Sequence, residues 1–156
     1  MKNIARKIVL SFLKSCSKRR LKNFKGRVVA VTGSVGKSST KDAIYAVLNT
    51  KFRVKRTKKS MNSEFGLPLT ILDIDSGFNS ALKWSFLSAK AFINSFFKMH
   101  EEIIILELGV DAPGDMDFLT NIVKPDVAIV TNIAPVHMEE GQFSSLEEIF
   151  KEKSKL

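Results

Sequence analysis

Three short runs of apolar, mostly β-branched residues constrain the fold of this chain more than any other feature. They are RVVAVT at 27–32, IIILEL at 103–108 and DVAIVT at 126–131. Such runs, bounded by polar turn residues, are typical of strands that are buried on both faces of a parallel sheet. Helical patterns lie between and after them, so the sequence predicts an α/β fold, in which a mostly parallel sheet is flanked by helices.

The other elements follow from apolar spacing and turn residues. We expect an edge strand at 52–56 and helices at 36–48, 78–99, 114–123 and 144–155. In the second of these helices, lysines interrupt every apolar stretch, which favours an amphipathic helix over a membrane span. The last helix has Ser144 at its start and Glu147 in capping-box spacing. Residues 66–74 contain a proline and then an apolar run, and their type stays ambiguous.

The net charge of +9 belongs to the N-terminus. Residues 1–25 hold nine Lys and Arg and no acidic residue, whereas the remainder is neutral. A nucleic-acid-binding domain more often carries its basic face on the folded body, so we expect no nucleic-acid partner. Apolar residues near helical spacing predict a basic amphipathic helix in this segment. Two interpretations stay open: packing on its own or another domain, and peripheral contact with an anionic membrane.

Cysteine usage and the N-terminus also bear on location. The single cysteine, Cys16, excludes an internal disulfide and a cysteine metal cluster. The apolar stretch at 8–13 is short, and the basic residues 18–20 follow it in place of a small-residue cleavage site, which argues against export. We therefore predict a reducing, cytoplasmic setting.

A glycine loop follows the first predicted strand and leads into the first helix after it. The segment TGSVGKSST occupies 32–40. Glycines let backbone N–H groups turn toward an anion, and the helix N-terminus adds its positive dipole end. In a phosphate loop, Lys37 would reach the β- and γ-phosphates and the Ser38 hydroxyl would ligate Mg²⁺. The strict phosphate-loop pattern, G-x-x-x-x-G-K-[ST], has a glycine at the position of Val31, so this sequence departs from it there. The part that matches is G-x-x-G-K-S at 33–38.

Polar segments also follow the other two predicted strands, at 107–111 and 132–137. Because the carboxyl ends of parallel strands share one edge of a sheet, we expect all three segments to meet at one crevice. Glu107 lies within an apolar run, where an unpaired carboxylate would cost several kcal/mol, so a metal or cationic partner is expected.

Five blocks together resemble the Mur ligase family over about residues 26–156. Besides the loop, they are NSEFGLPLT at 62–70, ELG at 107–109 with PGDM at 113–116, TNI at 131–133 with a later histidine, and SLE at 145–147 with KEK at 151–153. The loop alone is shared with many ATPases, but the five blocks in this order are specific. Folylpolyglutamate synthase is a relative of the same family.

The resemblance implies the central ATP-binding domain of an amide ligase of peptidoglycan precursor synthesis. In this chemistry ATP phosphorylates a carboxylate, and an amine attacks the resulting acyl phosphate. The block at 107–116 resembles the branch that adds D-alanyl-D-alanine to a UDP-MurNAc-peptide. The implied cofactors are ATP and Mg²⁺.

The resemblance also implies roles for particular residues. The implied nucleotide-binding residues are Thr32, Gly33, Ser34, Val35, Gly36, Lys37, Ser38, Ser39, Asn62 and Asn132. The implied metal ligands are Ser38, Glu107 and His137, and the implied catalytic residues are Lys37, His137 and Lys153. In several members a lysine on the last helix is carbamylated; Lys153 matches best and Lys151 is the fallback, although the spacing from His137 is about two residues longer than usual.

Structural roles are the alternative for other polar residues. Asp111 and Asp115 are expected as a helix-start cap and a first-turn acid. The basic segment 55–59 is expected to be a solvated loop.

The resemblance also implies a protein of three domains. A UDP-binding domain would precede this one, and a nucleotide- and amine-binding domain would follow it. We therefore expect 1–25 to be a separate basic segment and 26–156 to be a C-terminally incomplete domain that lacks the C-terminal ligase domain. The alternatives are another P-loop ATPase or kinase, a folylpolyglutamate synthase-like ligase, and a membrane-associated module. A GTPase would need an N-K-x-D-like segment, which TNIA at 131–134 does not supply.

Overall fold

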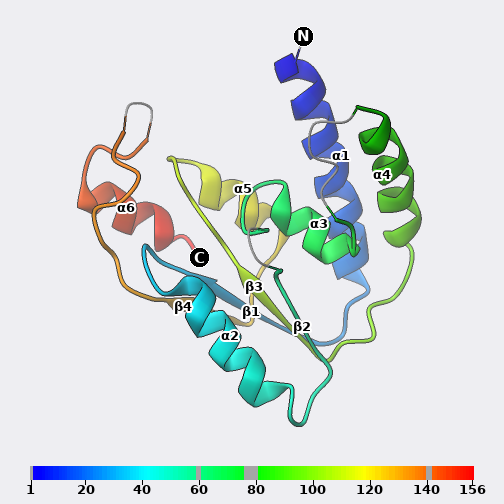
Figure 1. Ribbon diagram of the computed structural model, residues 1–156, viewed down its shortest axis with the longest axis horizontal. Helices are drawn as coiled ribbons and strands as arrows, with labels where there is room; N and C mark the ends of the chain where they lie inside the picture. The colour runs from blue at the N-terminus through cyan, green and yellow to red at the C-terminus, as the bar shows by residue number, and fades with distance from the viewer. Residues whose placement is uncertain (1, 59–60, 76–80, 140–141) are drawn as a thin grey trace.

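The computed structural model describes residues 2–58, 61–75, 81–139 and 142–156 (Figure 1). Its strands are β1 (Arg27–Thr32), β2 (Val54–Arg56), β3 (Ile103–Glu107) and β4 (Val127–Val130). Its helices are α1 (Lys2–Lys22), α2 (Lys37–Leu48), α3 (Gly66–Leu72), α4 (Ala81–Asn94), α5 (Asp115–Ile122) and α6 (Leu146–Lys153).

The four strands form one sheet in the order β2-β3-β1-β4, and every pairing is parallel. The predicted α/β fold, a parallel sheet flanked by helices with a basic helix at the N-terminus, is confirmed. β1 lies between β3 and β4, with Val29 opposite Ile105 on one side and Val127 on the other. The carboxyl ends of the three strands therefore meet at one edge of the sheet.

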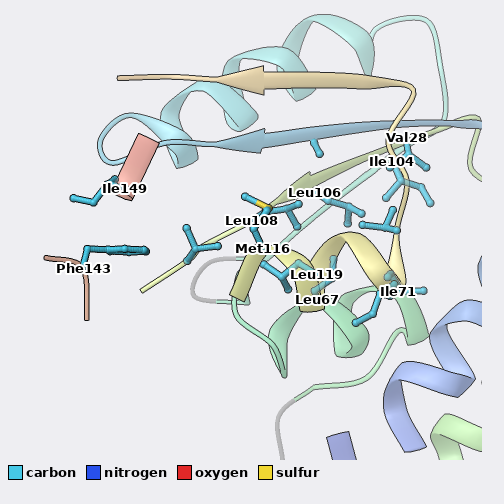
Figure 2. Packing of buried hydrophobic residues seen from close by; sticks show 14 residues of the cluster. Val28, Leu67, Ile71, Ile104, Leu106, Leu108, Met116, Leu119, Phe143 and Ile149 are labelled. Atoms are coloured by element: carbon cyan, nitrogen blue, oxygen red, sulfur yellow. The ribbon is translucent and has the colours of Figure 1, made fainter. Parts of the chain in front are cut away.

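Helices cover both faces of the sheet. α2 packs on the face that carries Val29, Val31 and Ile105. The opposite face joins α3, α5 and α6 in the main core (Figure 2). In that core Leu106 and Leu108 meet residues from these helices, namely Leu67, Met116, Leu119 and Ile149.

The basic N-terminal helix packs on its own domain. α1 lies against α3, α4 and α5, and its Leu13 and Cys16 are buried. The Arg20 guanidinium is also buried, donates to the Ile71 carbonyl at 2.8 Å and pairs with Asp73 at 2.7 Å. Of the two interpretations of this helix, packing on the domain is confirmed. Among the residues that the structure describes, no helix has the length and apolarity needed to cross a membrane.

Several elements differ from their predicted bounds or type. The ambiguous segment 66–74 contains the helix α3, in which Pro68 is tolerated because first-turn N–H groups have no intrahelical acceptor. The predicted helix 78–99 is α4, which ends at Asn94, where the side-chain amide donates to the Leu72 carbonyl at 2.7 Å; residues 78–80 lie outside the described residues. The predicted strand at 52–56 is the edge strand β2.

Two local interpretations were wrong. The cap of α6 is Ser145, whose hydroxyl accepts from the Glu148 N–H, so the predicted pair Ser144 and Glu147 is one residue out of register. The basic segment is only partly a solvated loop. Lys55 lies in β2 and pairs with Asp73, and Thr57 is 1% exposed, because β2 continues along β3; residue 59 lies outside the described residues.

Candidate nucleotide site

The glycine loop lies between the end of β1 and the start of α2. Gly33 and Gly36 have φ angles of 143° and 87°, which side chains rarely adopt. A Cβ at Gly33 would stand 1.9 Å from the Thr131 hydroxyl oxygen, whereas a Cβ at Gly36 would meet nothing within 4 Å. Gly33 is therefore required both by its φ angle and by the lack of room for a Cβ, whereas Gly36 is required by its φ angle alone.

The loop is fixed to the segment that follows β4. The Ser34 N–H donates to the Asn132 carbonyl at 2.7 Å, and the Ser34 hydroxyl donates to the Ala134 carbonyl at 2.9 Å. The Thr131 hydroxyl donates to the Val35 carbonyl at 2.7 Å. Asn132 therefore supports the loop through its backbone. The predicted meeting of the segments after β1 and β4 is confirmed.

Lys37 is the first residue of α2, and its ammonium folds back over the loop. Its Nζ donates to the Gly33 carbonyl at 2.8 Å and to the Ser34 carbonyl at 3.1 Å. Gly36 caps the helix without a side chain, and the first turn holds no acidic residue. A lysine, turned glycine amides and an uncapped helix N-terminus together favour an anion at this position.

Glu107, the last residue of β3, is the centre of a buried hydrogen-bonded group. Its carboxylate accepts from the Ser38 hydroxyl at 2.9 and 3.0 Å and from the Asn62 amide at 3.2 Å. The Lys41 ammonium donates to it at 3.0 Å. The glutamate is 4% exposed, and Ser38 reaches it because β1 and β3 are neighbours, with Val31 opposite Glu107.

Lys41 is the site residue that the sequence reasoning missed. The apolar setting of Glu107 correctly required a cationic partner, and Lys41, 3% exposed, is that partner in this structure. The signal was its position four residues after Lys37, which places both lysines on one side of α2.

Thr32 and Asn62 fix the surroundings of this group. The Thr32 hydroxyl donates to the Leu108 carbonyl at 2.9 Å. The Asn62 carbonyl accepts from the Gly109 N–H at 2.8 Å, and a Cβ at Gly109 would approach the Asn62 side chain to 3.1 Å. Asn62 thus reaches Glu107 because a glycine two residues further along lets its backbone approach.

The side chain of His137 contacts Asp111 rather than a member of the Ser38–Glu107 group. Its Nε2 is 3.4 Å from a carboxylate oxygen of Asp111, and its φ of 55° is left-handed. The expectation that Asp111 caps a helix is wrong, since the cap of α5 is Gly114. Asp115 is confirmed as a first-turn acid, and its carboxylate accepts from the N–H groups of Asp111 and Ala112.

Lys153, on the last helix, is buried. It is 1% exposed and its Nζ donates to the Val110 carbonyl at 3.4 Å. Burial, followed by repulsion from Lys37, lowers the pKa of Lys153 to about 8, against the opposing attraction of Asp111 and of other acids. Lys151, by contrast, is exposed and pairs with Glu147.

The loop, its lysine and the serine–glutamate contact at the ends of parallel strands define a P-loop-like α/β domain. The profile of the Mur ligase middle domain matches residues 31–156. The chain therefore belongs to the Mur ligase family.

Individual proteins similar to this chain belong to the same family. A UDP-N-acetylmuramoyl-tripeptide--D-alanyl-D-alanine ligase of Bacillus subtilis is 36% identical over 131 residues, which cover 84% of this chain and 24% of the relative. The ligase of the same name from Borreliella burgdorferi is 35% identical over 128 residues, 82% of this chain and 22% of the relative. The crystal structure of a MurF ligase from Thermotoga maritima in complex with ADP has a TM-score of 0.72 and 34% identity, over 94% of this chain and 28% of that one. The chain thus spans about a quarter of the length of these relatives.

Proposed function

We propose that this chain is the ATP-binding part of a ligase that joins D-alanyl-D-alanine to a UDP-MurNAc-tripeptide. The substrate class rests on the names of the two bacterial relatives, and ATP rests on the ADP complex of the similar solved structure. The observation that carries the proposal is the placement of Lys37 on the glycine loop beside the contact between Ser38 and Glu107. These names also favour the cell-wall substrate over a folate.

The proposed reaction forms an acyl phosphate between the substrate carboxylate and the γ-phosphoryl group, with ADP as the first product. The amine of D-alanyl-D-alanine then attacks the acyl carbon, the amide bond forms and phosphate leaves. A reaction of this kind depends on positioning and on neutralisation of charge more than on a protein nucleophile. Here the loop 32–39 would surround the phosphates, and Lys37 would turn from the loop carbonyls to the β- and γ-phosphates.

The donors around Glu107 fit Mg²⁺, which prefers oxygen ligands and keeps several waters. A hydroxyl and a carboxylate already touch each other there, from Ser38 and Glu107. Among the described residues no three His, Cys, Asp or Glu form a metal cluster, so the substrate phosphates would complete the site. The ion would supply positive charge against the phosphate oxygens. His137, with Asp111, would contribute to a second ion, and Asn62 would orient Glu107.

Lys153 and Asn132 complete the proposed site. A lysine whose pKa is lowered to about 8 has roughly a tenth of its amine neutral at pH 7, far more than a lysine with the ordinary pKa. Neutral amines are the form that reacts with carbon dioxide, so Lys153 suits carbamylation better than Lys151. Asn132 would act on the nucleotide indirectly, because its carbonyl holds the loop at Ser34.

The test is calorimetric titration of the chain with ADP and ATP, each with and without Mg²⁺. We expect binding that Mg²⁺ strengthens and that Lys37→Ala weakens at least tenfold, because charge-assisted contacts to phosphate are lost. Lys51→Ala, an exposed lysine beyond the end of α2, is the matched control and should bind as the parent does. Equal binding by both variants would exclude a phosphate role for Lys37, and preference for GDP over ADP would favour another P-loop class.

A further inference from the structure

Helix α4 carries large apolar side chains on the side that faces solvent as well as on the side that faces the domain. Its inner side packs in a core cluster through Ala91 and Leu87. Its outer side presents Phe86 and Ile93, which are 71% and 55% exposed, and Phe97 just beyond the helix is 61% exposed. Large apolar side chains that stand exposed together on one side of a helix mark a surface that contacts a partner.

The outer side of α4 continues onto α1. Ile4 and Ile8 are 66% and 64% exposed, and helical spacing places Arg19 on the same stripe of α1. The Arg19 guanidinium lies over the Phe96 ring at 4.6 Å and also contacts the Phe92 ring, so the stripe meets α4. Figure 1 shows the two helices side by side, on the side of the sheet away from α2. We define the α1–α4 face by its exposed residues Ile4, Ile8, Phe86, Ile93, Phe96 and Phe97.

The charge of this surface has one sign. α1 contains eight Lys and Arg and α4 contains two, and neither helix contains an acidic residue. Three carboxylates of neighbouring segments are already paired: Glu64 with Arg6, Asp73 with Arg20, and Asp75, which also interacts with Lys90 of α4, with Lys58. Large exposed apolar side chains thus stand among basic residues.

We propose that the α1–α4 face binds the surface of an anionic lipid bilayer. Aromatic and aliphatic side chains of such a face enter the boundary between headgroups and acyl chains, while Lys and Arg meet the lipid phosphates. The mode is peripheral contact. The surface differs from the one expected from sequence, because α1 uses Leu13 and Cys16 inside the domain and α4 supplies most of the exposed apolar residues.

This binding leaves the nucleotide site open. The phosphate loop leads into α2, which packs on the sheet face opposite to α3, and α3 lies between the sheet and the α1–α4 face. Lipid and nucleotide therefore bind to different parts of the chain. The proposal does not depend on which ligase substrates are used.

The experiment is sedimentation of the full chain with large vesicles of phosphatidylcholine alone or mixed with phosphatidylglycerol. We expect the chain to pellet with the mixed vesicles and to be released as salt rises, since each basic residue near the surface contributes roughly fivefold to binding. The double variant Phe86→Ser with Phe97→Ser should lose at least tenfold in partitioning. The matched control is Val47→Ser with Phe150→Ser, two exposed apolar residues on α2 and α6, which should bind as the parent does.

Thermal unfolding of both double variants checks that the fold is retained. The proposal is overturned if the parent stays in the supernatant, or if the α1–α4 and control variants bind alike. It is also overturned if the chain self-associates in the absence of lipid and the α1–α4 variant is monomeric by light scattering, because the face then joins two copies. Binding to a single-stranded oligonucleotide with the same dependence on Phe86 and Phe97 would likewise overturn it.

Discussion

The Lys41 ammonium and the Glu107 carboxylate form an ion pair at 3.0 Å in which both side chains are almost completely buried. Their relation explains how an acidic residue stands at the end of a buried strand, because the ammonium compensates the charge of the carboxylate. The same carboxylate contacts Ser38, so Lys41 holds it beside the loop where the nucleotide is proposed to bind. Removing one partner leaves the other charged and buried.

Lys41→Met is expected to lower the free energy of unfolding by about 3 to 5 kcal/mol, the usual cost of breaking a buried pair from one side. Urea unfolding of the parent, Lys41→Met, Glu107→Gln and the double variant measures it. The double variant should cost clearly less than the sum of the single changes, because neither charge is then left alone. Additive costs would show that the two groups do not interact. Lys51→Met, exposed beyond the end of α2, should change stability by less than about 0.5 kcal/mol.

The sequence alone predicted the elements that depend on continuous apolar runs. β1, β3 and β4 lie within a residue of their predicted bounds. A short run of β-branched residues between turn residues is typical of a buried parallel strand and too short for most helices. Family blocks located Ser38, Asn62 and Glu107, which the structure brings together. Their functional roles stay predictions.

The features that sequence did not predict depend on long-range packing. Lys41 had no predicted role, and the burial of Lys153 was not predicted either; only the packing of α2 on β3 and of α6 near Val110 buries these two lysines. The sequence predicted that α4 is amphipathic but not that Phe86 and Ile93 are exposed, since apolar spacing does not say which side of a helix is covered. The cap of α6 is Ser145, not Ser144. The sequence could not distinguish the two, because the serines are adjacent and either could cap the helix.

The two loop glycines should respond differently to alanine. Gly33→Ala is expected to cost more than about 2 kcal/mol, because its φ is left-handed and its Cβ would collide with Thr131. Gly36→Ala should cost about 1 to 2 kcal/mol from backbone strain alone, as its Cβ meets open space. Thermal or urea unfolding measures both. Thr131→Ala should recover part of the Gly33→Ala loss and none of the Gly36→Ala loss; equal recovery would contradict the collision.

Glu152 is expected to join α6 to the start of α5. Its carboxylate accepts from the N–H groups of Gly114 and Met116 at 3.0 and 2.7 Å, and the residue is 3% exposed. Glu152→Ala should therefore cost about 2 to 3 kcal/mol in urea unfolding, and Glu152→Gln less, since one amide oxygen still accepts. Glu147→Ala, in an exposed pair on the same helix, should change stability by no more than about 0.5 kcal/mol. Similar losses of unfolding free energy for Glu152→Ala and Glu147→Ala would contradict the role of Glu152 in joining α6 to α5.

The buried amine of Lys153 should make stability depend on pH. Its pKa is lowered to about 8 from 10.5, so below pH 8 both the folded and the unfolded chain carry the charge, and the folded chain bears the cost of burying it. Between these two values the unfolded chain holds the proton more than the folded chain does, and the free energy of unfolding rises with pH. Lys153→Met removes this dependence.

At pH 7, Lys153→Met should be more stable than the parent by about 1 to 2 kcal/mol, after allowance for the lost hydrogen bond to Val110. At pH 9.5 the gain should shrink by about 1 to 2 kcal/mol, because the parent lysine is then largely neutral in the folded state. Urea unfolding of both proteins at the two pH values gives the difference, in which the titration of every other group cancels. Lys151→Met, whose side chain is 71% exposed, is the control and should show no such change. A gap between Lys153→Met and the parent that is the same at both pH values would mean that this amine is charged in the fold throughout the range.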